Sequence, residues 1–248
     1  VLLNILKHQP RELGQKLLAK KVIYGNNYFF ISCNWHSRFN KLKYRNYFRK
    51  TSLKQKGIGE EFLNEIAFKK PKNFLEIGVF HGVTARNVCE LLWNIHGNDF
   101  NYVGLDLFDE SAENVNEIIP NTKFNNPLKK IYFEYILKQD PYSIEAVTYL
   151  LKKFKNNIHL IKGNSNQLLK KMDMSKIDYV FLDGGHAYET VKNDLENCIP
   201  VINNDGTVLC DDYDLSHAPG VKKAIKEFIE IYKYKIKIIS SRFASIEK

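Results

Sequence analysis

Short hydrophobic runs alternate along the chain with amphipathic segments, a pattern typical of alternating strands and helices. The run at residues 177–183, IDYVFLD, ends on Asp183, passes through two glycines and presents His186 before a new helical segment. The run at 206–212, GTVLCDD, ends on Asp211 and Asp212. Because ligands of open α/β sheets gather beyond the carboxyl ends of the strands, these two run ends predict a functional edge of a sheet.

The remaining runs complete the same α/β pattern. Hydrophobic positions recur at helical spacing in residues 57–68, in a segment that starts near Thr84, and in 220–232. Further strands are predicted by NFLEI before Gly78 and by residues 102–106 and 158–165, and the chain closes with a hairpin, YKIKIIS and RFASIEK. We therefore expect a doubly wound, Rossmann-like seven-stranded sheet with a terminal antiparallel strand pair.

Residues 107–157 form a connection longer than one crossover helix requires. Hydrophobic spacing predicts helices at 113–119 and at 144–154 within it. An insertion above the strand ends is expected to act as a substrate lid, and a surface elaboration or an oligomer contact is the alternative.

Positive charge is concentrated at the N-terminus. Residues 1–56 carry 13 Lys and Arg but only Glu12 as an acid, while the whole chain of 248 residues has a net charge of +9. Aromatic residues are interleaved with this charge in residues 28–56, so we expect either a helix that packs its aromatic side chains on the main domain or contact with an anionic surface. Nucleic acid is less favoured because no RNA-binding signature accompanies the charge. The predicted domains are a basic extension, 1–56, and a catalytic domain, 57–248.

The four cysteines, Cys33, Cys89, Cys198 and Cys210, lack the spacing of a zinc site and are expected to be free thiols. No hydrophobic run reaches the length of a membrane span. These observations favour a cytoplasmic location, with peripheral membrane contact through the basic extension as an option.

A glycine turn follows the first strand. Its pattern, Glu76-x-Gly78-x-x-x-Gly82, lets a ligand approach the main chain at the start of a helix, where an anion is favoured. It differs from the GxGxxG fingerprint and so disfavours a nicotinamide cofactor. Asp106 ends the next strand and is placed to accept hydrogen bonds from the ribose of an adenosine cofactor.

Together these motifs resemble the class I S-adenosylmethionine-dependent methyltransferases, in particular the metal-dependent O-methyltransferases of the catechol and macrocin type. The resemblance rests on the motifs FLEIGVFHG, YVGLD, KGNS, IDYVFLDGGHAYETVKND and TVLCDDYD followed by GVKKAIKEF. The resemblance covers residues 57–248. It implies that the chain transfers a methyl group from S-adenosylmethionine to a hydroxyl of a small molecule or sugar, with Mg²⁺ or a similar cation.

The resemblance also implies roles for individual residues. Gly78, Gly82 and Thr84 would hold the methionine part of the cofactor, Asp106 the ribose and Ser165 the adenine, with Glu76, Phe80 and Asp183 also at the cofactor site. Metal ligands would be Asp183, Asp211 and Asp212, and the catalytic residues His186, as general base, and Asp183. One departure is Asp212, since the catechol enzymes have an amide there. His81 and His217 are expected to be structural or rim residues.

Three alternatives stay open at this level. A nicotinamide-dependent oxidoreductase uses the same type of fold, and a non-methylating relative would keep the fold and the acids without the transfer. An RNA methyltransferase that uses the basic arm is a weaker option. A homo-oligomer is also expected, although no motif specifies it.

Overall fold

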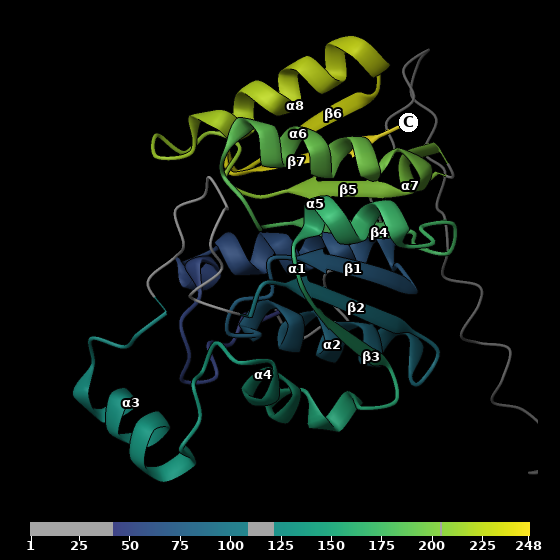
Figure 1. Cartoon of the computed structure of the whole chain (residues 1–248). Helices are drawn as coiled ribbons and strands as arrows, with labels where there is room; N and C mark the ends of the chain where they lie inside the picture. The colour runs from purple at the N-terminus through teal and green to yellow at the C-terminus, as the bar shows by residue number, and fades with distance from the viewer. Residues whose placement is uncertain (1–41, 109–121, 204) are drawn as a thin grey trace, which may run out of the picture. The chain divides into compact units, whose positions relative to one another are not determined.

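The computed structural model describes residues 42–108, 122–203 and 205–248, and residues 43–248 form one compact unit. A seven-stranded sheet with strand order β3-β2-β1-β4-β5-β7-β6 lies at its centre (Figure 1). The first five strands are parallel and β7 is antiparallel to β5 and β6. The predicted doubly wound sheet with a terminal antiparallel pair is confirmed. The strands are β1 Asn73–Ile77, β2 Asn101–Asp106, β3 Ile158–Lys162, β4 Tyr179–Leu182, β5 Thr207–Cys210, β6 Lys235–Ile239 and β7 Phe243–Glu247.

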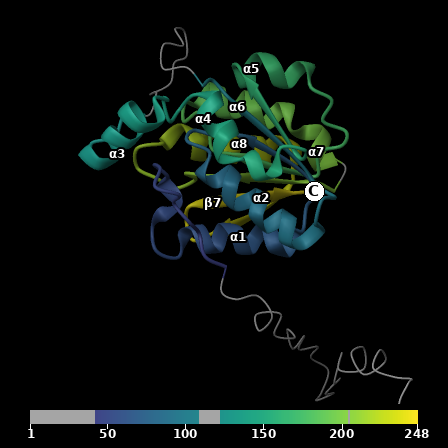
Figure 2. The same cartoon turned by 90° about the horizontal axis from the view of Figure 1, so that it is seen from below.

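Helices cover both faces of the sheet (Figure 2). They are α1 Ile58–Lys69, α2 Val83–His96, α3 Pro127–Ile131, α4 Ile144–Leu150, α5 Ser165–Leu168, α6 Tyr188–Asn197, α7 Ile199–Asn203 and α8 Pro219–Tyr232. Shorter turns are η2 Ser52–Lys54, η4 Lys152–Phe154 and η5 Leu169–Lys171, and a π-helical segment, η3 Tyr132–Leu137, continues α3.

Alternate strand residues pack against opposite layers, as the period of two requires. Leu75 and Ile77 of β1 belong to the core that contains Leu195 of α6 and Ile225 of α8. On the other face, Phe62 of α1 contacts Phe181 of β4, with ring centroids 4.6 Å apart. Apolar side chains make up most of both layers, and the predicted acids Asp183, Asp211 and Asp212 lie at the strand ends.

The C-terminal helix follows the predicted hydrophobic spacing closely. Val221, Ala224, Ile225 and Phe228 are buried against the sheet. Pro219 lies in its first turn, where the missing N–H costs no hydrogen bond. Tyr232, predicted on the same face, is 36% exposed because it lies in the last turn.

Part of the predicted basic extension packs within the compact unit. Tyr44 and Leu53 are buried, and the Tyr47 hydroxyl donates to Glu90 of α2 over 2.6 Å. Residues 42–50 are not helical, so the helix that would have carried these aromatics is wrong for this stretch. Residues 28–41 of the same stretch, and the predicted helix at 113–119, lie outside the described residues.

Two sequence expectations, on cysteines and on membrane spans, can be compared with the described residues, and Cys33 lies outside them. Cys89, Cys198 and Cys210 are free thiols and buried. Among the described residues, none of the helices has both the length and the apolar character to cross a bilayer.

Candidate active site

The parallel strands bring the predicted residues to one edge of the sheet. Two ladder bonds extend the strands by one residue: Asp183 N–H donates to Ile77 O over 2.8 Å, and Asp211 N–H to Leu182 O over 2.9 Å. The main chain of Asp183 is therefore fixed beside the end of β1, and that of Asp211 beside the end of β4.

The glycine turn is built for close backbone packing. Gly78 has φ 95°, and a Cβ atom there would collide with the carbonyl oxygen of Asp183. Gly82 has φ 73° and directly precedes α2, and a Cβ atom there would lie 2.8 Å from Val147 of the insertion. Both positions therefore require glycine for two reasons, the positive φ and the lack of space.

Asp106 joins this turn to the insertion. Its carboxylate accepts hydrogen bonds from Phe80 N–H over 2.7 Å and from the Tyr142 hydroxyl over 2.7 Å. Phe108 N–H donates to it over 3.2 Å. Tyr142 precedes α4, so the insertion contributes a polar group at the end of β2. Sequence reasoning missed Tyr142, because no local pattern marks a tyrosine that acts across 36 residues.

Glu76 is buried below the glycine turn and does not line the cavity beside it. The side chain is fully buried on the α1 and α2 face and accepts the Tyr102 hydroxyl over 2.6 Å. Burial raises the pKa of this carboxyl to about 8, and the Tyr102 bond offsets only part of that effect. Its role at the cofactor stays a prediction.

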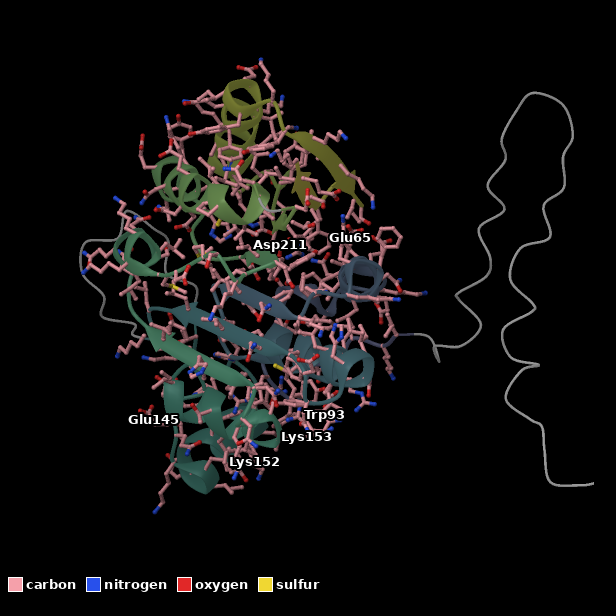
Figure 3. The ribbon with its side chains drawn as sticks, turned by 90° about the vertical axis from the view of Figure 1, so that its right-hand side faces the viewer. Glu65, Trp93, Glu145, Lys152, Lys153 and Asp211 are labelled. Carbon is pink, nitrogen blue, oxygen red and sulfur yellow. The ribbon has the colours of Figure 1, made fainter. Side chains whose placement is uncertain are left out.

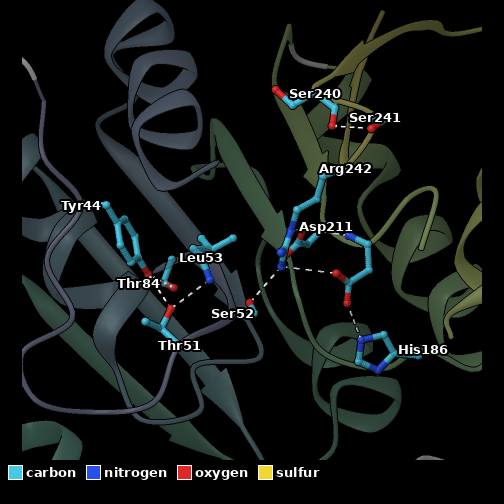
Figure 4. Close-up of polar contacts among 11 residues, drawn as sticks. Tyr44, Thr51, Ser52, Leu53, Thr84, His186, Asp211, Ser240, Ser241 and Arg242 are labelled. Atoms are coloured by element: carbon cyan, nitrogen blue, oxygen red, sulfur yellow. Dashed lines mark hydrogen bonds and ion pairs between the residues drawn. The ribbon is translucent and has the colours of Figure 1, made fainter. Parts of the chain in front are cut away.

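Thr84 and Ser165, the other two predicted cofactor residues, lie on separate helices, α2 and α5. The Thr84 hydroxyl is 2.8 Å from the Tyr44 hydroxyl, which is also 3.0 Å from the Thr51 hydroxyl, so the segment before α1 holds Thr84 (Figure 4). Ser165 is the first residue of α5, and Asn164 caps that helix. The adjacent Gly163 N–H donates to Asp106 O, so this loop runs beside the end of β2.

The three predicted acids converge. One carboxylate oxygen each from Asp183, Asp211 and Asp212 lies within 4.8 Å of the others. Successive residues of a strand point to opposite sides, but Asp212 has φ 57°, which breaks the alternation after Asp211. Asp211 and Asp212 are buried, and Asp183 is half-buried.

Arg242, immediately before β7, is the strongest partner of this cluster. Its Nε donates to Asp211 Oδ1 over 2.6 Å and its NH2 group to Asp211 Oδ2 over 2.7 Å, in a buried two-point ion pair. The same NH2 group is 3.4 Å from Asp212 Oδ1 and donates to the Ser52 hydroxyl over 2.9 Å (Figure 4). Sequence reasoning missed Arg242, since an arginine between two terminal strands carries no motif.

Burial and mutual repulsion shape the charge state of the acids. Burial, followed by the charges of Asp211 and Asp212, raises the pKa of Asp183 well above its usual range. Burial also raises the pKa of Asp211, although the Arg242 bond opposes it. Burial raises the pKa of Asp212 too, but the bond with His186 and the charge of Arg242 outweigh it and lower this pKa overall.

His186 completes the edge. Its Nε2 lies 2.7 Å from Asp212 Oδ2, which orients the ring against the acidic cluster. His217 is exposed at the rim, with its ring centroid 6.3 Å from that of His186, while His81 is fully buried and stacks on Phe80 at 4.1 Å.

A cavity of about 250 Å³ joins these groups. It is lined by residues 78–81, 83 and 84 of the turn, by Lys50, Thr51 and Ser52, and by the polar residues Asp183, His186, Asp212 and His217. The predicted cofactor turn, general base and two of the acids therefore share one opening.

A family model described as a methyltransferase domain matches residues 75–213, more than half of the chain. The chain belongs to this methyltransferase family. It is a class I S-adenosylmethionine-dependent methyltransferase, as the sheet order with an antiparallel β7 also indicates. The match sets aside the nicotinamide-dependent oxidoreductase.

Solved structures share the fold of this methyltransferase at low identity. The O-methyltransferase NovP is 18% identical with a TM-score of 0.54, over 77% of this chain and 81% of that chain. The calicheamicin methyltransferase CalS11 is 16% identical with a TM-score of 0.55, over 79% and 80%. PaMTH1 of Podospora anserina, bound to SAH, is 16% identical with a TM-score of 0.53, over 76% of each chain. No curated protein sequence matches the chain.

The acidic cluster of the methyltransferase fits a hard divalent cation. Carboxylate oxygens are the ligands that Mg²⁺ prefers. Asp212 Oδ1 is buried without a hydrogen-bond partner among the described residues, and a cation would satisfy it. Arg242 supplies one positive charge against three carboxylates, so the cluster retains negative charge to attract an ion.

Proposed function

We propose that this methyltransferase transfers the methyl group of S-adenosylmethionine to a hydroxyl of a small molecule or sugar, assisted by Mg²⁺ or a similar cation. The observation that carries the proposal is that the His186–Asp212 pair and the glycine turn line the same cavity. The folds of NovP and CalS11, both described as methyltransferases, are consistent with it.

The cofactor is expected to lie along the strand ends. Gly78 and Gly82 let the turn pack closely and lead into α2, and the N–H groups at the start of that helix would favour the cofactor's carboxylate. Asp106 is the proposed ribose acceptor, and the Phe80 N–H and Tyr142 hydroxyl bonds hold its carboxylate in place. The Ser165 loop, beside the end of β2, is the proposed adenine side.

Asp183, Asp211 and Asp212 would hold the cation. A bound divalent cation lowers the pKa of a coordinated hydroxyl, so a weaker general base is sufficient to remove its proton. Arg242 fixes the Asp211 carboxylate from the side of β7, which keeps the donor atoms in place. Preorganisation of this kind reduces the reorganisation needed when the acceptor arrives.

His186 is the proposed general base. The bond between Nε2 and Asp212 fixes the ring against the acidic cluster, and an imidazole is a group that can take the acceptor's proton near neutral pH. The carboxylate of Asp212 then stabilises the charged imidazolium. The methyl transfer itself needs alignment and exclusion of water, which the turn and the insertion are placed to provide.

The test of this role is His186→Ala. Turnover is expected to fall by about 10²–10⁴-fold, because the hydroxyl loses its proton acceptor. S-adenosylmethionine binding should stay close to wild type, since His186 lies on the acceptor side. Turnover is measured by label transfer from tritiated S-adenosylmethionine to a catechol or nucleotide-linked sugar. Cofactor binding is measured by calorimetry.

The matched control is His217→Ala, which removes an exposed imidazole from the rim of the same cavity. It should lose far less activity than His186→Ala. Equal losses in the two variants, or unchanged turnover in His186→Ala, would remove His186 from the mechanism.

A further inference from the structure

The insertion carries an apolar surface that the proposed reaction does not use. Five side chains of α3 and η3 are between 38% and 70% exposed, and we call them the apolar stripe: Leu128, Ile131, Tyr132, Tyr135 and Ile136. They follow the helical spacing i, i+3, i+4, i+7 and i+8. Contiguous exposed apolar side chains of this kind mark an interaction surface.

The helix that carries the stripe is well anchored. Asn126 caps it by accepting from Leu128 N–H and Lys129 N–H, and Pro127 occupies its first turn. Phe133 is buried, stacks on Phe124 with centroids 5.1 Å apart, and lies under the Arg49 guanidinium at 5.2 Å. Phe133 therefore fixes which side of the helix faces the body, and the side chains of the stripe are left exposed. Figure 1 shows α3 at the margin of the fold.

Positive charge borders the stripe. Residues 127–138 contain three lysines but only Glu134 as an acid. Lys129 is turned towards the body, where its ammonium donates to Arg49 O over 3.4 Å, so Lys130 and Lys138 are the exposed lysines. A groove of about 340 Å³ is lined by Tyr132 and by Tyr149, Lys152 and Lys153. The two lysines are labelled in Figure 3. The Lys152 ammonium lies 4.2 Å from the centre of the half-exposed Tyr149 ring.

This combination fits one partner better than the alternatives. An anionic bilayer offers an apolar layer for Leu128 and Ile136, an interfacial layer for tyrosines, and negative charge for the lysines. A second copy of the chain, packed stripe to stripe, would instead bring Lys130 and Lys138 of each copy towards the same lysines of the other, without added negative charge.

We propose that the apolar stripe docks this methyltransferase on a membrane surface that contains anionic lipid. The stripe enters the boundary between headgroups and acyl chains, while the lysines remain at the phosphate level. The contact is peripheral and requires no membrane-spanning helix. It does not depend on the identity of the methyl acceptor.

The test is co-sedimentation of the full chain with vesicles of phosphatidylcholine alone and of equal parts phosphatidylcholine and phosphatidylglycerol. Wild type should bind the anionic vesicles and bind the neutral ones much less. The double variant Ile131→Glu/Ile136→Glu should weaken binding by about tenfold or more per substituted side chain, because apolar burial is lost and negative charge is added.

The matched control is Ile231→Glu, which puts the same substitution on a 58% exposed isoleucine of α8. This variant should bind like wild type, and the thermal unfolding of all variants should be alike. Undiminished binding by the double variant would overturn the proposal and move the contact to another segment, such as the basic residues 1–56. No wild-type binding would also overturn it, as would a self-association in light scattering that the double variant abolishes.

Discussion

Arg242 determines how much negative charge the acidic cluster carries. It holds both oxygens of Asp211 and lies 3.4 Å from Asp212, and both Arg242 and Asp211 are buried. Without it, three carboxylates would face one another in a region of low polarity. At the scale of single residues, therefore, Arg242, which belongs to no sequence motif, sets the charge around Asp211 and Asp212, which do.

Arg242→Met should be strongly destabilising. Removal of one partner of a buried ion pair leaves the other charge without compensation, which costs about 3–5 kcal/mol of unfolding free energy. Urea denaturation measures this loss. In the control, Lys222→Met, the broken ion pair with Asp214 is exposed and should cost no more than about 1 kcal/mol. A loss in Arg242→Met no larger than the control's would show that Asp211 is not charged in the folded protein.

The raised pKa of Glu76 should make the stability of the fold depend on pH, and the direction of this dependence can be predicted. Its folded-state pKa, about 8, lies above the ordinary 4.5, so the folded chain keeps a proton that the unfolded chain releases in between. Stability from this group is thus complete below about 4.5 and falls as the pH rises towards about 8.

Glu76→Gln should flatten that dependence, because the amide oxygen still accepts the Tyr102 hydroxyl but no longer titrates. Thermal unfolding of the variant and wild type, followed across this pH range, checks it. The two should unfold at similar temperatures at the acidic end, with the variant more stable at the alkaline end. Parallel curves would mean that Glu76 is ionised in the fold.

At the scale of elements, the glycine turn ties β1 to β4. Because Gly78 packs on the Asp183 main chain, the turn and the first acid of the cluster move together. A side chain at residue 78 has to separate the cofactor turn from the acids.

Gly78→Ala should therefore reduce both stability and S-adenosylmethionine affinity. Gly57→Ala is the control: Gly57 has a similar φ of 88°, but a Cβ atom there meets no atom within 4 Å. The control carries only the backbone strain, about 1–3 kcal/mol, with unchanged cofactor binding. Calorimetry with S-adenosylmethionine separates them, and equal affinities in both variants would show that the contact with Asp183 is unimportant.

The same scale shows what the sequence could predict. Asp183, Asp211 and Asp212 could be placed together because each follows a hydrophobic run whose end is fixed by parallel pairing. Tyr142 and Arg242 could not be found, because their partners are distant in sequence and depend on how the insertion and β7 fold back. The predicted helix in residues 42–50 failed because contacts of Tyr44 and Tyr47 with α2 residues override local propensity.

On the scale of the whole molecule, the candidate active site and the apolar stripe lie in different parts of the fold. The sheet edge gathers the cofactor turn, the acids and His186, whereas the insertion supplies both Tyr142 at Asp106 and the exposed α3 and η3 face. The insertion thus contacts Asp106, the proposed ribose acceptor, and also carries the proposed membrane surface. Whether it also closes over substrate, as predicted from its length, stays a prediction.

The most direct test of the central claim is Mn²⁺ binding, followed by electron paramagnetic resonance with S-adenosylmethionine present. Mn²⁺ stands in for Mg²⁺ because both are hard ions that prefer oxygen ligands. The account predicts a single site per chain that Mg²⁺ displaces and that Asp183→Asn weakens strongly. Absence of stoichiometric binding, or undiminished affinity in Asp183→Asn, would contradict a cation site at this cluster.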